Sequence, residues 1–335
     1  MSVLAGLAEL TDRAGAGAAP PPAKLFEAGD LGRPSEGLAG WVAAATPGVT
    51  TFGGLAGPVD GLAAGLVKIA GRSGTAATWV GELVLGEFAE RSLGTAGSEL
   101  VAADADAAWP RIRCGVEPPR GDGIRRWVLA PPGAPGAVVI LPGVTRARAL
   151  FVDDLAPFAR GGLIGLAGLE LFDLGDATAA GAIDPALGRD ATDALVALGA
   201  IVDVAVDLGI GVGFLGKIAA YVTAGASDPT AVEVAALERL GEAYAVLGAL
   251  AEGLFELAQA PADAPRPGDL RRRAAAHRTL LRDRAGAILS ELFELAGARA
   301  TAGRFDLDAP WRDFIARQAV HPIAAALPTT IEQEI

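Results

Sequence analysis

Cysteine and histidine are almost missing from this chain of 335 residues, which contains only Cys114, His277 and His321. A single cysteine cannot form an intramolecular disulfide, so the sequence fits a reducing compartment and we expect a cytoplasmic protein. Three such side chains are too few for a zinc site of the His/Cys type, so we predict no metal centre. Any nucleophile activated by a histidine would have to use one of these two.

Basic residues are also in deficit, with 28 Lys and Arg against 40 Asp and Glu and a formal net charge of −12. Negative charge repels the phosphates of nucleic acids and the surfaces of anionic membranes. We therefore expect neither partner. The first residues include Glu9 and Asp12 and have no basic segment at their start, so they are not predicted to be a signal peptide.

Long uninterrupted apolar runs are absent too, because the longest window, Leu195 to Val222, contains Asp203, Asp207 and Lys217. Charges in the middle of a bilayer are costly, so this window predicts a buried helix of a soluble bundle. Its glycines at 209, 211, 213 and 216 superficially suggest a phosphate-binding loop, but they lie inside a helical pattern with no strand before them. Close helix packing is the favoured interpretation.

The residue pattern of the chain changes twice and predicts a mainly α protein with a small β domain. The expected parts are an N-terminal helical domain over 1–105, a reduced β domain over 106–183 and a C-terminal helical bundle over 184–335. The first part is helical, with a short helix at Leu38–Ala45 and two further helices separated at Arg72-Ser73-Gly74. The second contains short runs rich in Val, Ile and Leu between Pro and Gly, which are strand signals. The third predicts four helices of an antiparallel bundle: Thr192–Val222, Val232–Gln259, Leu270–Leu295 and one beginning near Ala309.

One basic cluster stands out in this acidic chain: Arg271, Arg272, Arg273, Arg278, Arg282 and Arg284. Two interpretations remain open. The cluster is either a solvated helix face paired with nearby acids, or a docking surface for an acidic carrier domain or for the phosphates of coenzyme A, which arginine binds well.

The most distinctive stretch is Ala298 to Pro322, which follows a helix that Gly297 ends. Small residues, Phe305 and Pro310 lead into Trp311-Arg312-Asp313 on a new helix. This order resembles the C-terminal end of the acyl-CoA dehydrogenase superfamily, and is most similar to the branch of flavin-dependent monooxygenases typified by dibenzothiophene monooxygenase. The earlier order of aromatic-Gly-Gly-Leu, helix, and Ser-Gly-small-Ala-x-Trp79 is similar to the N-terminal domain of the same superfamily.

The resemblance implies an N-terminal helical domain, a reduced β-barrel and a C-terminal four-helix bundle. It places His321 where the superfamily carries its catalytic base, and a histidine titrates near the operating pH. Asp193 lies near the position used for the base by other members, although acids in the first turn of a helix are also favoured by the helix dipole. The implied cofactor-binding residues are Gly297, Arg299 and Trp79, and the implied cofactor is FAD or FMN.

The chain also departs from the superfamily pattern. An arginine that reaches the flavin pyrophosphate usually follows an Ala-Tyr pair, but here Ala220-Tyr221 is followed by Val-Thr-Ala-Gly225. The flavin loop of the β domain has no counterpart in 106–183. Flavin binding is therefore expected to be weak or absent.

Two functions follow from the resemblance. The first is an oxidoreductase acting on an acyl thioester, free or carrier-bound, or on a bulky apolar small molecule. The second is a flavin-free member, working as a non-catalytic partner subunit or as a non-redox enzyme of the cyclase or dehydratase type in the same cavity. For either we expect a homo-oligomer or a hetero-oligomer with a flavin-bearing homologue, because a helix that is apolar on more than one face needs something to cover it.

Overall fold

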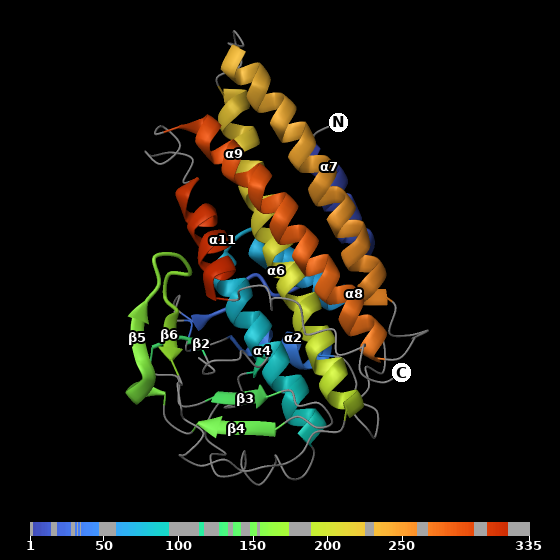
Figure 1. Ribbon diagram of the computed structural model, residues 1–335, viewed down its shortest axis with the longest axis vertical. Helices are drawn as coiled ribbons and strands as arrows, with labels where there is room; N and C mark the ends of the chain where they lie inside the picture. The colour runs from blue at the N-terminus through green and yellow to red at the C-terminus, as the bar shows by residue number, and fades with distance from the viewer. Residues whose placement is uncertain are drawn as a thin grey trace, which may run out of the picture.

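The computed structural model describes fifteen stretches of the chain, and the account below concerns these residues: 3–14, 19–27, 31, 33, 35–46, 58–93, 114–116, 127–132, 137–141, 148–152, 155–173, 189–224, 231–259, 267–297 and 307–320. Long helices run side by side through the body of the molecule, and short strands lie at one end of them (Figure 1). Helices predominate, with a small amount of sheet, as predicted.

The described residues of the N-terminal part form four helices: α1 (Val3–Ala14), α2 (Glu36–Ala45), α3 (Asp60–Ala70) and α4 (Gly74–Leu93). Serine side chains define two of their starts. The Ser35 hydroxyl accepts the Leu38 N–H at 3.1 Å at the start of α2, and the Ser73 hydroxyl accepts the Ala76 N–H at 3.1 Å at the start of α4. The predicted break at 72–74 is confirmed, because α3 ends and α4 begins on either side of it.

Among the described residues, six strands form two sheets of three. The first has the order β1-β3-β4, with β1 (Cys114–Val116) parallel to β3 (Ala137–Leu141) and β3 antiparallel to β4 (Arg148–Val152). The second has the order β2-β6-β5, all antiparallel, from β2 (Trp127–Ala130), β5 (Ala159–Gly162) and β6 (Glu170–Asp173). The loop between β5 and β6 reaches back to the helices. Whether the sheets close into a barrel stays a prediction, as do the three domain boundaries.

The C-terminal part contains α6 (Arg189–Ala224), α7 (Ala231–Gln259), α8 (Pro267–Leu280), α9 (Gly286–Ala296) and α11 (Asp308–Val320). The helix predicted over Leu270–Leu295 is α8 and α9 joined by a π-helical turn at Leu281–Ala285, which the apolar spacing did not reveal. It ends at Gly297, whose φ of +62° favours glycine.

Helix α6 is the centre of the molecule. It packs against α3 and α4 on one side and against α7, α8, α9 and α11 on the others (Figure 1). Its segment Ala197–Val222 is the one described helix that is long and apolar enough to cross a membrane, and 72% of its most apolar window is buried inside the protein. The prediction of a buried bundle helix is confirmed. Both faces are covered within the chain, so α6 itself supplies no argument for a partner subunit.

The glycines of α6 allow two helix backbones to touch. A Cβ added at Gly209 would lie 2.5 Å from the Val67 carbonyl oxygen, and one at Gly213 would lie 2.5 Å from that of Gly71. The packing interpretation of these glycines is therefore confirmed.

We predict that Gly213→Ala lowers the free energy of unfolding by about 1–3 kcal/mol, because the new methyl group can be accommodated only by moving α3 or α6. Gly241→Ala is the matched control, since a Cβ there meets no described atom within 4 Å. The control should gain about 0.5–1 kcal/mol from helix propensity. Urea denaturation of both variants checks the pair, and equal effects of the two would contradict the close approach.

Candidate functional site

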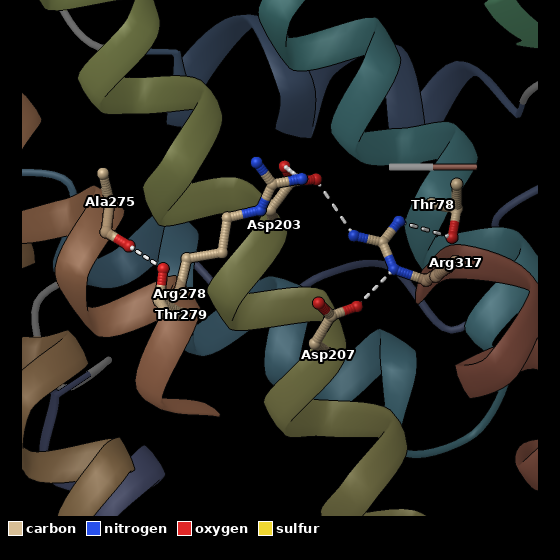
Figure 2. Close-up of polar contacts among 7 residues, drawn as sticks. All are labelled: Thr78, Asp203, Asp207, Ala275, Arg278, Thr279 and Arg317. Atoms are coloured by element: carbon tan, nitrogen blue, oxygen red, sulfur yellow. Dashed lines mark hydrogen bonds and ion pairs between the residues drawn. The ribbon is translucent and has the colours of Figure 1, made fainter. Parts of the chain in front are cut away.

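Four charged side chains meet in the interior of the helical bundle. Arg317 of α11 is 2% exposed, and its Nε donates to Asp207 Oδ1 at 2.5 Å. Its two other nitrogens donate to Asp203 Oδ1 and to the Thr78 hydroxyl, both at 3.0 Å. Arg278 of α8 pairs with the other oxygen of Asp203 at 2.9 Å. Figure 2 shows this network, which joins α4, α6, α8 and α11.

The charges of the network stabilise one another. Burial by itself lowers the pKa of the Arg317 guanidinium, but the negative charges of Asp207 and Asp203 outweigh burial, and the pKa lies above its ordinary value. Two arginines face two aspartates, so the four formal charges cancel. Arg317 is therefore a permanent cation that can act as an anchor but not as an acid or base.

A second anchor lies one turn earlier on α11. The Asp313 carboxylate accepts the backbone N–H of Leu166 at 2.7 Å and also that of Thr75, at the first turn of α4. Leu166 belongs to the β5–β6 loop, is fully buried, and has a φ of +58°, which a leucine adopts only under strain. A Cβ added at Gly165 would lie 2.1 Å from the Arg312 carbonyl oxygen. The loop is thus pressed against the backbone of α11.

Aromatic rings cover another part of α11. The rings of Trp311 and Phe293 are nearly parallel, with centroids 5.4 Å apart and 15° between their planes. Phe214 of α6 lies 6.0 Å from Trp311, and Phe314 lies 6.3 Å from it. Such offset pairs add to the apolar burial that holds helices together. The aromatic cluster therefore packs α11 against α6 and α9.

The fold built around these contacts is shared with flavoenzymes. XiaF from Streptomyces sp., solved with FADH2 and glycerol, is 16% identical with a TM-score of 0.61, covering 96% of this chain and 92% of that one. Dibenzothiophene monooxygenase TdsC from Paenibacillus sp. A11-2 is 17% identical with a TM-score of 0.56, covering 97% and 94%. The chain has the acyl-CoA dehydrogenase fold. The resemblance found at both ends of the sequence is therefore confirmed as a likeness of fold.

A third neighbour is the ChsE4–ChsE5 complex from Mycobacterium tuberculosis, at 17% identity and a TM-score of 0.57, with 98% of this chain and 94% of that one covered. No protein-family model matches the sequence, and no curated protein matches it in sequence. The chain therefore shares a fold with known proteins over nearly its whole length.

Within this acyl-CoA dehydrogenase fold, three of the predicted site residues belong to described helices or their ends. Trp79 of α4 is 2% exposed and its indole N–H donates to the Leu31 carbonyl oxygen at 2.9 Å. Gly297 ends α9, and the backbone of Asp193 belongs to α6. His321 and Arg299 lie outside the described residues, as does Gly225. The assigned roles of all five site residues stay predictions.

The basic cluster of α8 divides in the structure. Arg278 faces inward and pairs with Asp203, whereas Arg272 is exposed and pairs with Asp269 three residues earlier. Both observations agree with acidic pairing of these two arginines. Over the described part of the chain, no three His, Cys, Asp or Glu side chains come together as metal ligands would.

Sequence reasoning missed the buried network, although a signal for it was present. Asp203 and Asp207 are four residues apart in an otherwise apolar helix, and this spacing puts both carboxylates on one face. Buried carboxylates need a cationic partner. The sequence therefore predicts that a partner exists, but it does not say which arginine it is.

We predict that the contribution of Asp313 to stability falls as the pH rises. Burial raises the pKa of this carboxyl more than the N–H groups of Leu166 and Thr75 lower it. The native state therefore holds the Asp313 proton more tightly than the unfolded chain does. Its stabilising effect is complete below the ordinary Asp pKa of about 3.9 and is lost as the pH rises through the raised value.

Asp313→Asn removes this titration. The difference in unfolding free energy between the parent protein and the variant, measured by urea denaturation from pH 4 upward, should shift in favour of the variant as the pH rises. A difference that moves the other way would show that the two N–H groups outweigh burial at this carboxylate.

Proposed function

We propose that the protein is a flavin-dependent oxidoreductase acting on an acyl thioester or a bulky apolar small molecule. The observation that carries the proposal is the likeness of fold, over 96–97% of this chain, to XiaF solved with FADH2 and to the monooxygenase TdsC. The flavin would be FAD or FMN, held between the β strands and the helical bundle. The single cysteine agrees with a place in the cytoplasm.

We assign His321 as the base that takes the substrate proton. The assignment rests on the resemblance of Trp311-Arg312-Asp313 and the residues after it to the superfamily motif. It agrees with the firm attachment of α11, because the last turn of this helix carries Arg317 and His321 is the next residue after its end. Asp193 is the alternative base.

The flavin is expected to bind weakly. The arginine that would reach the pyrophosphate is replaced by Gly225, and a charge-assisted hydrogen bond is worth about 1.5–3 kcal/mol. An absorbance scan of the purified protein should therefore show less than one flavin per subunit, falling further on dialysis.

Gly225→Arg tests the cause. If the missing guanidinium weakens binding, this variant should hold flavin about ten- to a hundredfold more tightly, the range that such a hydrogen bond spans. Gly241→Arg, on an exposed position of α7, is the control for added charge. Full and stable flavin occupancy in the parent protein would contradict the weak-binding part of the proposal. It would strengthen the proposal that the protein is an oxidoreductase.

The second candidate is a flavin-free partner subunit. It is favoured by the replacement at Gly225 and by the likeness to ChsE4–ChsE5, which is a complex of two different proteins. Under this reading no flavin would bind even to Gly225→Arg, and the protein would co-purify with a flavin-bearing homologue.

Both candidates imply an oligomer, which we propose on the same fold. Two exposed residues of α7, Val234 and Leu237, are 47% and 46% accessible and lie on one side of the helix. Light scattering at micromolar concentration should show a dimer or larger species. A stable monomer, with no partner present, would contradict the oligomer that both the oxidoreductase proposal and the partner-subunit proposal require.

A further inference from the structure

Helix α11 is attached to the rest of the protein by two side chains one turn apart, the partly buried Asp313 and the buried Arg317. Asp313 and Arg317 are four residues apart, so they project from the same face of the helix. The Asp313 carboxylate accepts hydrogen bonds from the backbone N–H groups of Leu166 and Thr75. The Arg317 guanidinium donates to Thr78, Asp203 and Asp207. The β5–β6 loop, α4 and α6 therefore all meet one face of a helix of 13 residues.

Apolar packing alone would also hold this helix in place. The charged contacts therefore point to a further role besides stability. α11 already has the buried ring of Phe314 and the stacked ring of Trp311. Buried ion pairs are often no more stabilising than apolar residues of the same volume, and their best-attested use is to select one register. Apolar contacts allow small shifts along and around a helix axis, whereas hydrogen bonds have narrow distances and angles.

Arg317 is well suited to select a register. Its planar guanidinium presents donors in a fixed fork, and three acceptors from two helices meet it in different directions (Figure 2). Rotation of α11 about its axis, or a shift along it, would break at least one of these bonds. Asp207 is fully buried, so bulk solvent does not reach it to take the place of the guanidinium.

We propose that Arg317 is a positioning residue, which through Asp207, Asp203 and Thr78 sets the point and direction from which the chain leaves α11 toward His321. This inference rests on the proposed role of His321 as the base. Arg317 stands four residues before His321 in the sequence. The last residue of α11, Val320, directly precedes His321. A catalytic base must be held within hydrogen-bond reach of its proton, so the end of α11 has to be fixed.

The chain offers a direct test, because it contains only two histidines. The Cε1–H signals of His277 and His321 can be resolved by NMR in the full-length protein and assigned with His277→Gln. Asp207→Asn keeps the size of the side chain but removes the charge opposite Arg317. We expect the His321 signal to shift, broaden or split in this variant, and the amide hydrogens of the last turn of α11 to exchange at least tenfold faster.

The His277 signal is the internal control. Its Nε2 lies 2.7 Å from the Leu250 carbonyl oxygen, in the contact of α8 with α7. The network reaches α8 at the neighbouring Arg278, through Asp203, so the His277 signal should move far less than the His321 signal. Arg312→Met is the matched surface control, since Arg312 lies on the same helix but is half-exposed and pairs only along it with Asp308 among the described residues. This variant should leave the His321 signal unchanged.

Milder variants cover the case in which Asp207→Asn does not fold. Thr78→Val removes one acceptor from Arg317 and should move the His321 signal in the same direction by a smaller amount. Arg317→Lys keeps the charge but loses the fork, and should resemble Asp207→Asn rather than the parent protein. A folded variant of any of these three residues with unchanged His321 signal and unchanged exchange in α11 would overturn the proposal.

The outcome is separable from that of the proposed function. The NMR and exchange readouts need neither flavin nor substrate, so they decide the positioning role even if no flavin binds. Conversely, if His321→Ala retains turnover while Asp207→Asn still moves the His321 signal, the proposed base is wrong and the attachment of α11 stands.

Discussion

Replacing Arg317 with alanine is expected to lower the free energy of unfolding by about 3–5 kcal/mol, the cost of breaking a buried ion pair by removing one partner. The reason is the state of the carboxylates that remain. Asp207 is fully buried and would keep a negative charge without its cation, and Asp203 would lose one of its two arginines. Urea denaturation followed by circular dichroism measures the loss.

Arg312→Ala is the control on the same helix. Arg312 is 48% exposed and pairs with Asp308 at i,i+4, an arrangement worth about 0.3–0.5 kcal/mol. A double variant, Arg317→Met with Asp207→Leu, should recover most of the loss, since two apolar residues leave no unpaired charge at that point. If Arg317→Ala cost no more than Arg312→Ala, the network of Figure 2 would not exist in solution.

Removing the proposed base is expected to have the largest effect on catalysis. His321→Ala should lower turnover by about a hundredfold to ten-thousandfold, the usual contribution of a positioned acid–base group, with the fold retained. Steady-state rates on any substrate that the protein oxidises measure the effect. His277→Gln is the control, because His277 lies in the contact between α7 and α8.

His321→Glu asks whether the position itself carries the chemistry. A glutamate restores the acidic group that the dehydrogenase pattern has there, so part of the rate should return. The pH profile should move toward acid, because an unperturbed glutamate titrates near 4.3 and a histidine near 6.5. Full activity of His321→Ala would remove this residue from the mechanism and favour Asp193 or the partner-subunit function.

The helices were the most predictable part of the fold. The break at 72–74, the short helix predicted at Leu38–Ala45, and the long helices predicted at Thr192–Val222 and Val232–Gln259 all agree with the structure, because their apolar residues recur at helical spacing. The strands at 127–130, 137–141 and 148–152 lie in the region where short runs rich in Val, Ile and Leu predicted strands. The strand at Cys114–Val116 was missed, since three residues are too few for a pattern.

Pattern alone was insufficient where a local feature depends on a distant one. The π-helical turn at Leu281–Ala285 interrupts a regular apolar repeat. The positive φ of Leu166 was not predictable, because the residue at this position is neither glycine nor asparagine. The strained loop around Leu166 is held by contacts with α11, among them the bond to Asp313, 147 residues away in the chain.

The sequence by itself determined the helical class, the order of helices and strands, and the resemblance at both ends that led to the acyl-CoA dehydrogenase fold. These depend on local spacing and on short ordered motifs, which are readable in one dimension. Only the tertiary structure decided which charges meet. Asp203 and Asp207 had to have a cation, but the choice of Arg317 and Arg278 depends on how α8 and α11 pack against α6, because a charge is satisfied by whatever folding brings within a few ångströms.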